Sequence, residues 1–517
     1  MNDIQTTYDL HDYLQKIFKY DSFQEGQEEI ITDILNGRDV LGILRTGTGK
    51  SLCYQLPAKL LPGLTIVVSP LISLMIDQVR ELKAMQYKEV AALHSIEQRE
   101  IRQNILTELH KYKLLFVSPE LLQNNYILTQ LKRRQVSLFV VDEAHCISQW
   151  GYDFRTDYLR LPEVIASLNN PTVLALTGTA TPDIQTDIRH KLKRNTMIEH
   201  IYPMDRENIS LIVEEVAGSE ELKMKRLIEW IHAYETPAIV YFSSRLKTEQ
   251  IARHITGKIS NKKIAYYHGG LDTKDRLKIQ QQFMNDQLDV ICCTSAFGMG
   301  INKPNIRMVI HYHLPTRVEA YIQEIGRAGR DGKDSVSVLL YRNEDIHIPL
   351  NIIEHELPNR AELTFILQRL LQYKREEERI PVDESVIEQQ FMIEATKWRY
   401  LLYHLEKHQA VKEQEVFHSE EELTKVFKKI QQFTEMRLQE KRLHLQNVIS
   451  WIHTKNCFRQ VLYAPFQQAI TNRSFNCCSN CGYALPTKTI EKQQDEQITE
   501  TDWQTLLKKV LLIGDSY

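Results

Sequence analysis

The sequence has 517 residues, which is enough for three or four domains of ordinary size. Hydrophobic residues make up 43% of the chain and charged residues 25%, so intrinsic disorder is excluded for most of its length. Because Lys+Arg total 64 and Asp+Glu total 67, for a net charge of −3, a polyanionic partner must bind in a local groove rather than on a generally basic surface.

The N-terminal residues Met1–Gln5 lack a basic segment followed by an apolar core, so we expect no signal peptide and a cytoplasmic protein, nucleoid-associated if bacterial. The most apolar stretch, residues 64–76, contains Ser69, Pro70 and Ser73 and is too short to cross a bilayer, so no membrane partner is expected. Eight cysteines are too few for a disulfide scaffold in a chain of this length.

From residue 40 to residue 341, short β-branched runs alternate with helical stretches. Continuous apolar strands separated by helices are typical of parallel sheets covered on both faces, and two such series predict two α/β domains. We place these domains at 1–204 and 205–345, because Pro203 and a polar cluster interrupt the pattern between them. The strands predicted for the first domain are Val40–Leu44, Thr65–Ser69, Leu114–Ser118, Ser137–Val141 and Thr172–Thr177. Those predicted for the second are Ala238–Phe242, Lys263–His268, Val290–Thr294, Arg307–Tyr312 and Ser335–Tyr341.

A glycine-containing loop follows the first predicted strand. Glycines allow such a loop to curl so that backbone N–H groups face phosphates at a helix N-terminus. Lys50 would reach the β- and γ-phosphates of ATP, and the Ser51 hydroxyl would bind Mg²⁺. Leu44 stands where the strict pattern has its first glycine, so a glycine-rich turn without nucleotide is the alternative. The loop residues expected to bind the nucleotide are Thr46, Gly47, Thr48, Gly49, Lys50 and Ser51.

Two carboxylates, Asp142 and Glu143, follow the strand predicted at Ser137–Val141. In open α/β folds, ligand chemistry takes place at the carboxyl edge of the parallel sheet. Asp142 would hold Mg²⁺ through water, and Glu143 would orient and deprotonate the attacking water. The alternative, a helix cap with surface charges, is disfavoured by the presence of Lys50 and Ser51 upstream.

The second domain carries a pair of arginines, Arg327 and Arg330, after Gln323. Residues three apart share a helix face, so we expect both side chains to point into the cleft between the domains. There they would stabilise the charge that develops on a transferred γ-phosphate. A solvated basic helix is the alternative for this segment taken alone.

After residue 345 the strand signals nearly vanish. We expect a mainly helical, zinc-binding region over 346–486 and then a linker and a last helix over 487–517, with an apolar face at Trp503–Leu512. The apolar pattern between Asp383 and Phe417 indicates a small winged-helix-like unit or plain helix packing, and a long helix is expected over Ser419–Lys455.

Four late cysteines provide the soft ligands of one tetrahedral zinc site. The alternative is four buried free thiols, which the adjacent pair in this cluster keeps open. The expected zinc ligands are Cys457, Cys477, Cys478 and Cys481.

Taken together, these motifs resemble superfamily 2 helicases, and specifically the RecQ family of DNA helicases. The stretches that carry the resemblance are residues 142–155, 296–304 and 326–332, and the likeness covers most of residues 10–345 and resumes at the late cysteines. It implies two tandem RecA-like domains that open and close with each ATP cycle. The residues after Cys481 are too few for the full winged-helix and HRDC-type domains of longer relatives.

The resemblance also implies contacts to single-stranded DNA. Trp150 and Phe154 would stack on bases and Arg155 would add charge, although aromatic residues are more often part of a core. Hydroxyl groups and helix N-termini at strand ends would position the phosphates. The further expected contacts are Ser69, Pro70, Ser244, Arg245, His268 and Thr294.

The segment before the first strand resembles the family's adenine-reading segment. Tyr20 would stack on the adenine and Gln27 would bond its edge, but Gln24 stands where the family usually has an arginine. The loss of a cation–π partner predicts weaker ATP binding. Another departure is Gly178, in the segment 177–181 that resembles the family's coupling motif and usually carries alanine at this position.

The sequence therefore predicts an ATP-dependent 3′→5′ DNA helicase of DNA repair or recombination, monomeric, with ATP, Mg²⁺ and Zn²⁺ as cofactors and single-stranded and partially duplex DNA as partners. A superfamily 2 RNA helicase and a DNA-binding scaffold with little turnover are the competing hypotheses. The scaffold is disfavoured because Lys50, Asp142, Glu143, Arg327 and Arg330 are all present.

Overall fold

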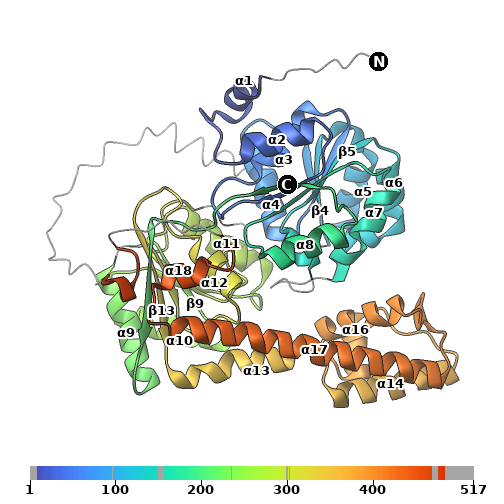
Figure 1. Ribbon diagram of the computed structural model, residues 1–517. Coiled ribbons are helices and arrows are strands. Elements are labelled where there is room, and N and C mark those ends of the chain that lie inside the picture. Colours follow the sequence, from blue (N-terminus) through green and yellow to red (C-terminus); the bar gives the residue numbers. More distant parts are fainter. Residues whose placement is uncertain are drawn as a thin grey trace.

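The computed structural model describes residues 9–95, 97–148, 156–234, 236–298, 301, 303–467 and 476–483. They form two α/β lobes and a helical region that extends below both of them in Figure 1. Within the described ranges, none of the helices combines the length and the apolar composition that crossing a bilayer requires.

Lobe 1, residues 9–201, is built on a seven-stranded parallel sheet in the order β3-β4-β2-β5-β6-β1-β7. Its strands are β1 (Val40–Ile43), β2 (Leu64–Val68), β3 (Val90–Leu93), β4 (Leu114–Val117), β5 (Val136–Val141), β6 (Thr172–Thr177) and β7 (Ile198–Ile201). Its α-helices are α1 (Leu10–Tyr13), α2 (Gln27–Leu35), α3 (Leu52–Leu60), α4 (Ile72–Ala84), α5 (Arg99–Thr107), α6 (Asn125–Lys132), α7 (Leu161–Ser167) and α8 (Pro182–Lys191). Helices cover both faces of the sheet, so its central strands are buried throughout, as their continuous apolar sequences require.

Lobe 2, residues 209–345, contains a six-stranded parallel sheet in the order β10-β11-β9-β12-β13-β8. Its strands are β8 (Ile209–Glu215), β9 (Ala238–Tyr241), β10 (Ile264–Tyr267), β11 (Val290–Cys293), β12 (Met308–His311) and β13 (Ser335–Tyr341). Its α-helices are α9 (Glu220–Ala233), α10 (Arg245–Lys258), α11 (Thr273–Met284) and α12 (Val318–Ile325). The fold class predicted from the sequence is confirmed.

In the described residues of the two lobes the ten predicted strands are present, together with three that were not predicted: β3, β7 and β8. Strand β3 has two alanines among four residues, and alanine has little preference for strands. Strand β7 is a half-exposed edge strand with Glu199 and His200 at its centre. Strand β8 lies at the other sheet's edge, immediately after the segment that joins the lobes.

The C-terminal region begins with α13 (His347–Glu356) and contains a separate small core. We call its far end the distal bundle, residues 360–430. The bundle consists of α14 (Arg360–Arg375), α15 (Glu384–Phe391), α16 (Ala395–Lys407), the hairpin β14 (Val411–Lys412) and β15 (Glu415–Val416), and the first part of α17 (Glu420–Ile452). Helices α15 and α16 with the hairpin occupy the span in which the winged-helix-like unit was expected.

Helix α17 joins the distal bundle to lobe 2 (Figure 1). Ser419 and Glu422 form a capping box at its start, and its 33 residues correspond to a length of about 50 Å. Near its end, Trp451 packs against Tyr321 of α12, in a core that includes both lobes and α18 (Phe458–Tyr463). At the other end, Glu406 of the bundle forms an ion pair with Arg160 of lobe 1. The predicted terminal helix at Trp503–Leu512 lies outside the described residues.

Candidate active site

A cavity of about 590 Å³ lies between the lobes, and both lobes provide its lining. Lobe 1 contributes the loop after β1, the acidic pair after β5 and the segment before α2; lobe 2 contributes α12 and the turn that follows it. All the residues expected to contact the nucleotide are therefore brought together: Tyr20, Gln24, Gln27, Thr46, Gly47, Thr48, Gly49, Lys50, Ser51, Asp142, Glu143, Gln323, Arg327 and Arg330.

The phosphate loop between β1 and α3 is curled as its glycines allow. Gly47 and Gly49 have φ angles of 92° and 66°, which residues other than glycine rarely adopt. The Thr48 hydroxyl donates to the carbonyl of Arg45 over 2.9 Å and closes the loop internally. The helix begins at Leu52, one residue after Ser51, so the loop lies at a helix N-terminus where an anion is favoured.

Gln27 is positioned differently from the expectation. Its amide nitrogen donates to the carbonyls of Thr48 and Gly49 over 2.7 and 3.0 Å, and its amide oxygen accepts from the N–H of Gln24 over 2.8 Å. The side chain thus links the adenine-side segment to the phosphate loop. Tyr20 is 46% exposed and lies parallel to Phe18, so its ring is available at the mouth of the cavity.

The two carboxylates lie at the end of β5, as predicted. Glu143 has a φ of +48°, an uncommon conformation for a residue with a side chain, and its N–H donates to Oδ1 of Asp142 over 3.0 Å. Burial and the neighbouring Glu143 raise the pKa of Asp142. Burial alone would raise the pKa of Glu143 as well, but Lys50, His145 and Arg327 lower it. The pKa values of the two carboxyl groups are therefore shifted in opposite directions, as an acid–base site requires.

His145 connects the acidic pair to the next strand. Its Nδ1 lies 3.4 Å from Oε2 of Glu143 and 2.8 Å from the hydroxyl of Thr177, at the end of β6. The adjacent Gly178 faces the phosphate loop, because a Cβ atom there would lie 3.0 Å from Nζ of Lys50. The segment 177–181 thus contacts the nucleotide-binding elements directly.

The prediction that Arg327 and Arg330 share a helix face is wrong. Helix α12 ends at Ile325, and both residues lie in consecutive turns, which we call the arginine turn (residues 326–333). Gly329 at its centre has a φ of +55°, so the chain changes direction where a helix would continue. Both arginines nevertheless line the cavity, because the turn itself faces lobe 1.

Arg327 is oriented by the second domain's own backbone. It donates a hydrogen bond to the carbonyl of Gly298, and the hydroxyl of Tyr241 donates to the adjacent carbonyl of Phe297 over 3.1 Å. Its Nε is buried and has no hydrogen-bond partner among the described residues. A buried guanidinium with an unused donor at this position suits an anionic ligand such as a phosphate.

The structure describes some, but not all, of the residues that are expected to contact DNA. Trp150, Phe154 and Arg155 lie outside the described residues. Ser69 and Pro70 follow β2, Ser244 precedes α10, and Thr294 follows β11, so these residues are at the carboxyl ends of parallel strands. The hydroxyl of Ser69 is buried and without a hydrogen-bond partner within the part of the chain that the structure describes.

The ring of His268 is not accessible to a phosphate in this conformation. The ring is buried, its Nε2 lies 2.9 Å from Oε1 of Glu249, and its Nδ1 accepts from the N–H of Gly270. The guanidinium of Arg245 lies beside this segment, since a Cβ at Gly270 would lie 3.5 Å from its Nη1. The arrangement favours Arg245 as the charged group there.

The four late cysteines come together, with their sulfur atoms all within 4.8 Å of one another. The Sγ atoms of Cys457 and Cys477 are 3.5 Å apart, and those of Cys457 and Cys478 are 3.8 Å apart. Such separations are close to those of four thiolates around one ion at about 2.3 Å, so the donor set fits zinc. The cluster lies against the edge of lobe 2, because the N–H of Leu211 donates to the carbonyl of Cys477.

Sequence reasoning missed Arg206 and Asn208, which lie in the segment between the lobes and hydrogen-bond to the arginine turn. The segment was recognised as a joint. A single arginine in a linker carries no pattern, and only the tertiary structure determines where its side chain points.

Two family models match the chain. The model described as DEAD/DEAH box helicase matches residues 24–187, and the model described as Helicase conserved C-terminal domain matches residues 222–332. The two matched spans lie in lobe 1 and lobe 2 and include the phosphate loop and the arginine turn, respectively.

Curated relatives match over long stretches. The chain is 40% identical over 503 residues to the probable ATP-dependent DNA helicase RecS of Bacillus subtilis, which covers 97% of both proteins. It is 42% identical over 335 residues to the ATP-dependent DNA helicase RecQ of Haemophilus influenzae, covering 64% of this chain and 53% of that protein. The chain thus spans about half the length of that RecQ protein and almost all of RecS.

Solved structures share the fold at low sequence identity. The Mycobacterium smegmatis helicase Lhr, solved with ssDNA and AMP-PNP, aligns with a TM-score of 0.56 at 19% identity, over 75% of this chain and 55% of that one. The DEAD-box helicase Mss116, bound to ssRNA and UDP-BeF, aligns with a TM-score of 0.57 at 17% identity, over 88% of both chains. At such identity these matches establish the two-lobed architecture alone.

Proposed function

The chain belongs to the RecQ family of ATP-dependent DNA helicases, and on this premise we propose that it moves 3′→5′ along single-stranded DNA and unwinds duplexes in DNA repair or recombination. The observation that carries the proposal is the composite cavity, whose cationic groups come from both lobes. A site divided in this way is complete only when the lobes close, so hydrolysis and lobe movement are coupled.

Each residue has a role that its position supports. Lys50 and the N–H groups of the phosphate loop bind the β- and γ-phosphates, and Glu143 accepts a proton from the attacking water. Arg327 and Arg330 stabilise the charge on the transferred phosphoryl group. Ser51 and Asp142 would hold Mg²⁺, which neutralises charge on the phosphate oxygens when it is bound.

The DNA strand is proposed to cross the carboxyl ends of the strands in both lobes, where Ser69, Ser244, Arg245 and Thr294 lie. Trp150, Phe154 and Arg155 are proposed to join them as a stacking surface. Zinc is proposed to bind Cys457, Cys477, Cys478 and Cys481 and to stabilise the fold locally.

The decisive experiment measures ATP hydrolysis without nucleic acid, with single-stranded DNA and with single-stranded RNA. Stimulation by DNA supports the proposal, and stimulation by RNA alone would assign the chain to RNA unwinding. Partial duplexes with either a 3′ or a 5′ single-stranded tail then determine the direction, because a 3′→5′ motor unwinds the 3′-tailed substrate. Preference for the 5′ tail would overturn the proposed polarity.

A further inference from the structure

The segment between the lobes is hydrogen-bonded to different parts of the molecule before and after Pro203. On its lobe 1 side, the N–H of Tyr202 donates to the carbonyl of Ile43 over 3.0 Å. Immediately after Pro203, the N–H groups of Met204 and Asp205 donate to Oε1 of Gln467 over 2.9 and 3.3 Å. Residues from 204 onward are therefore attached to the C-terminal region and lobe 2.

Arg459 of α18 strengthens this attachment. Arg459 is 1% exposed, and its side chain donates to the carboxylate of Asp205 and to the carbonyls of Arg206 and Ile209. Arg459 follows Cys457 by two residues, and Cys457, one of the candidate zinc ligands, is the N-cap residue of α18. A guanidinium bound to a carboxylate and two carbonyls leaves the backbone at Arg206 little freedom.

The side chain of Arg206 points from this fixed backbone toward the nucleotide cavity. It is 8% exposed and donates to the carbonyls of Gly326, over 3.0 Å, and Gly329. Those two carbonyls flank Arg327 in the chain. The same guanidinium is beside the phosphate loop, because a Cβ atom at Gly47 would lie 3.3 Å from its Nη1.

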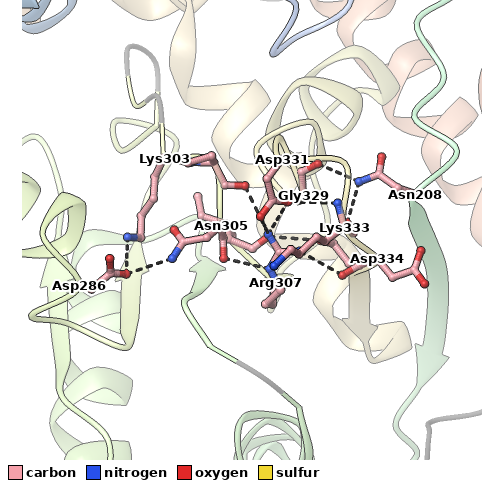
Figure 2. Close-up of polar contacts among 12 residues, drawn as sticks. Asn208, Asp286, Lys303, Asn305, Arg307, Gly329, Asp331, Lys333 and Asp334 are labelled. Carbon is pink, nitrogen blue, oxygen red and sulfur yellow. Dashed lines mark hydrogen bonds and ion pairs between the residues drawn. The ribbon is translucent and has the colours of Figure 1, made fainter. Parts of the chain in front are cut away.

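The far side of the arginine turn is anchored by Arg307 of lobe 2 and by Asn208 of the segment between the lobes, as Figure 2 shows. Nη2 of Arg307 donates to both carboxylate oxygens of Asp331, over 2.7 and 2.6 Å, and Asn208 donates to the carbonyls of Gly329 and Lys333, each over 2.8 Å. On the side that faces lobe 1, Arg206 donates to the carbonyls of Gly326 and Gly329, and the hydroxyl of Thr46 also donates to that of Gly326 over 3.3 Å. Loss of Arg206 would thus remove the charged donor of both carbonyls and leave each of them a neutral one, Thr46 or Asn208.

We propose that Arg206 is a positioning residue that aims Arg327 and Arg330 at the transferred phosphate, and that Arg459 holds Arg206 in place from the C-terminal region. The inference rests on the proposed function, because it concerns the rate of ATP hydrolysis stimulated by DNA. Without Arg206, two buried carbonyls lose a charged donor, and the arginines lose alignment that matters mainly in the transition state.

The test compares Arg206→Gln, Arg206→Lys and the control Arg226→Gln in the full-length protein. Arg226 lies on α9 and pairs with Glu214 and Glu229, away from the cavity. We expect Arg206→Gln to lower kcat for DNA-stimulated ATP hydrolysis about 10- to 100-fold with KM for ATP nearly unchanged, and Arg206→Lys, which retains a donor, to recover part of it. An unchanged kcat in Arg206→Gln, or a loss of the same size in Arg226→Gln, would overturn the inference.

A mutant cycle separates positioning from general destabilisation. If Arg206 acts through Arg327 and Arg330, adding Arg206→Gln to a protein that carries both Arg327→Ala and Arg330→Ala lowers the rate of ATP hydrolysis no further. Multiplicative losses would overturn the inference. A wild-type protein that hydrolyses ATP without any response to DNA would refute the proposed function instead. In that case the rates of ATP hydrolysis without DNA, compared between the wild type and the Arg206 variants, would still test the role of Arg206.

Discussion

Nζ of Lys50 lies 4.0 Å from Oε1 of Glu143 in the floor of the cavity, although the two residues are 93 positions apart in the sequence. This pairing places the group that binds phosphate next to the group that activates water. We expect Glu143→Gln to lower kcat for ATP about 100-fold or more while ATP still binds, because the amide keeps the shape but accepts no proton. Lys50→Ala should weaken binding as well. Nucleotide-binding titrations and steady-state ATPase assays distinguish the two, and an active Glu143→Gln protein would contradict the assigned role.

Gly298 provides a test of how Arg327 is oriented. A Cβ atom at this position would lie 2.4 Å from Nε of Arg327 and 2.7 Å from the hydroxyl of Tyr241, and the φ of +124° is unfavourable for alanine. We therefore expect Gly298→Ala to displace the guanidinium and to lower kcat at least about 10-fold. Gly257→Ala is a matched control, because no atom lies within 4 Å of a Cβ there. Equal rates in the two variants would show that Arg327 does not depend on Gly298.

Gln24 and Tyr20 both line the cavity, and Gln24 stands at the position where the resemblance to the RecQ family implies an arginine. Replacing it with arginine would add a cation above the adenine ring, and a cation–π contact contributes about 0.5–2 kcal/mol. We expect Gln24→Arg to lower KM for ATP by roughly 3- to 10-fold at an unchanged kcat. The ATP concentration dependence of hydrolysis measures this directly, and an unchanged KM would refute the account.

The cysteine cluster predicts one equivalent of zinc in the purified protein. Cys478→Ser should lose the metal and lower the thermal midpoint, because Cys478 is fully buried and pairs with Leu211 of β8. Cys53→Ala removes a buried thiol of lobe 1 and should retain the metal. Metal analysis and thermal unfolding of both variants test this, and a wild-type protein without zinc would end the interpretation.

His404 makes the distal bundle sensitive to acid. Its ring is packed between Tyr400 and Phe433, and burial, assisted by Lys407, lowers its pKa to about 4 from the ordinary 6.5. The folded bundle therefore holds the neutral ring, whereas the unfolded chain takes up a proton below pH 6.5, so stability falls as the pH decreases from 6.5 toward 4. We expect the free energy of unfolding of the bundle to fall by about 2 kcal/mol between about pH 7 and pH 5.

His404→Phe should remove most of this dependence. Hydrogen exchange of the α16 amides, corrected for the intrinsic effect of pH, measures the free energy of opening at both values. Parallel changes in the wild type and the variant would assign the acid sensitivity to other groups.

The nucleotide site could be predicted because its parts are short and contiguous. The loop at residues 46–51 and the pair Asp142–Glu143 follow apolar strands, and parallel strands present their carboxyl ends at one edge. The geometry of the arginine turn could not be predicted, since a spacing of three residues suits a helix as well as a turn. Gln27 and His268 were assigned to ligands, but each hydrogen-bonds to protein groups that only the fold brings near.

The distal bundle is connected to lobe 1 in two ways. One connection follows the chain through lobe 2 and α17, and the other is the ion pair between Arg160 of lobe 1 and Glu406 of the bundle. Because α17 is about 50 Å long, a rotation of about 10° at one end of this helix moves its other end by about 9 Å. Opening of the cleft near Pro203 would therefore move the distal bundle across lobe 1 and break this ion pair. Because both of its side chains are more than one third exposed, the pair opposes such a movement by no more than about 1 kcal/mol.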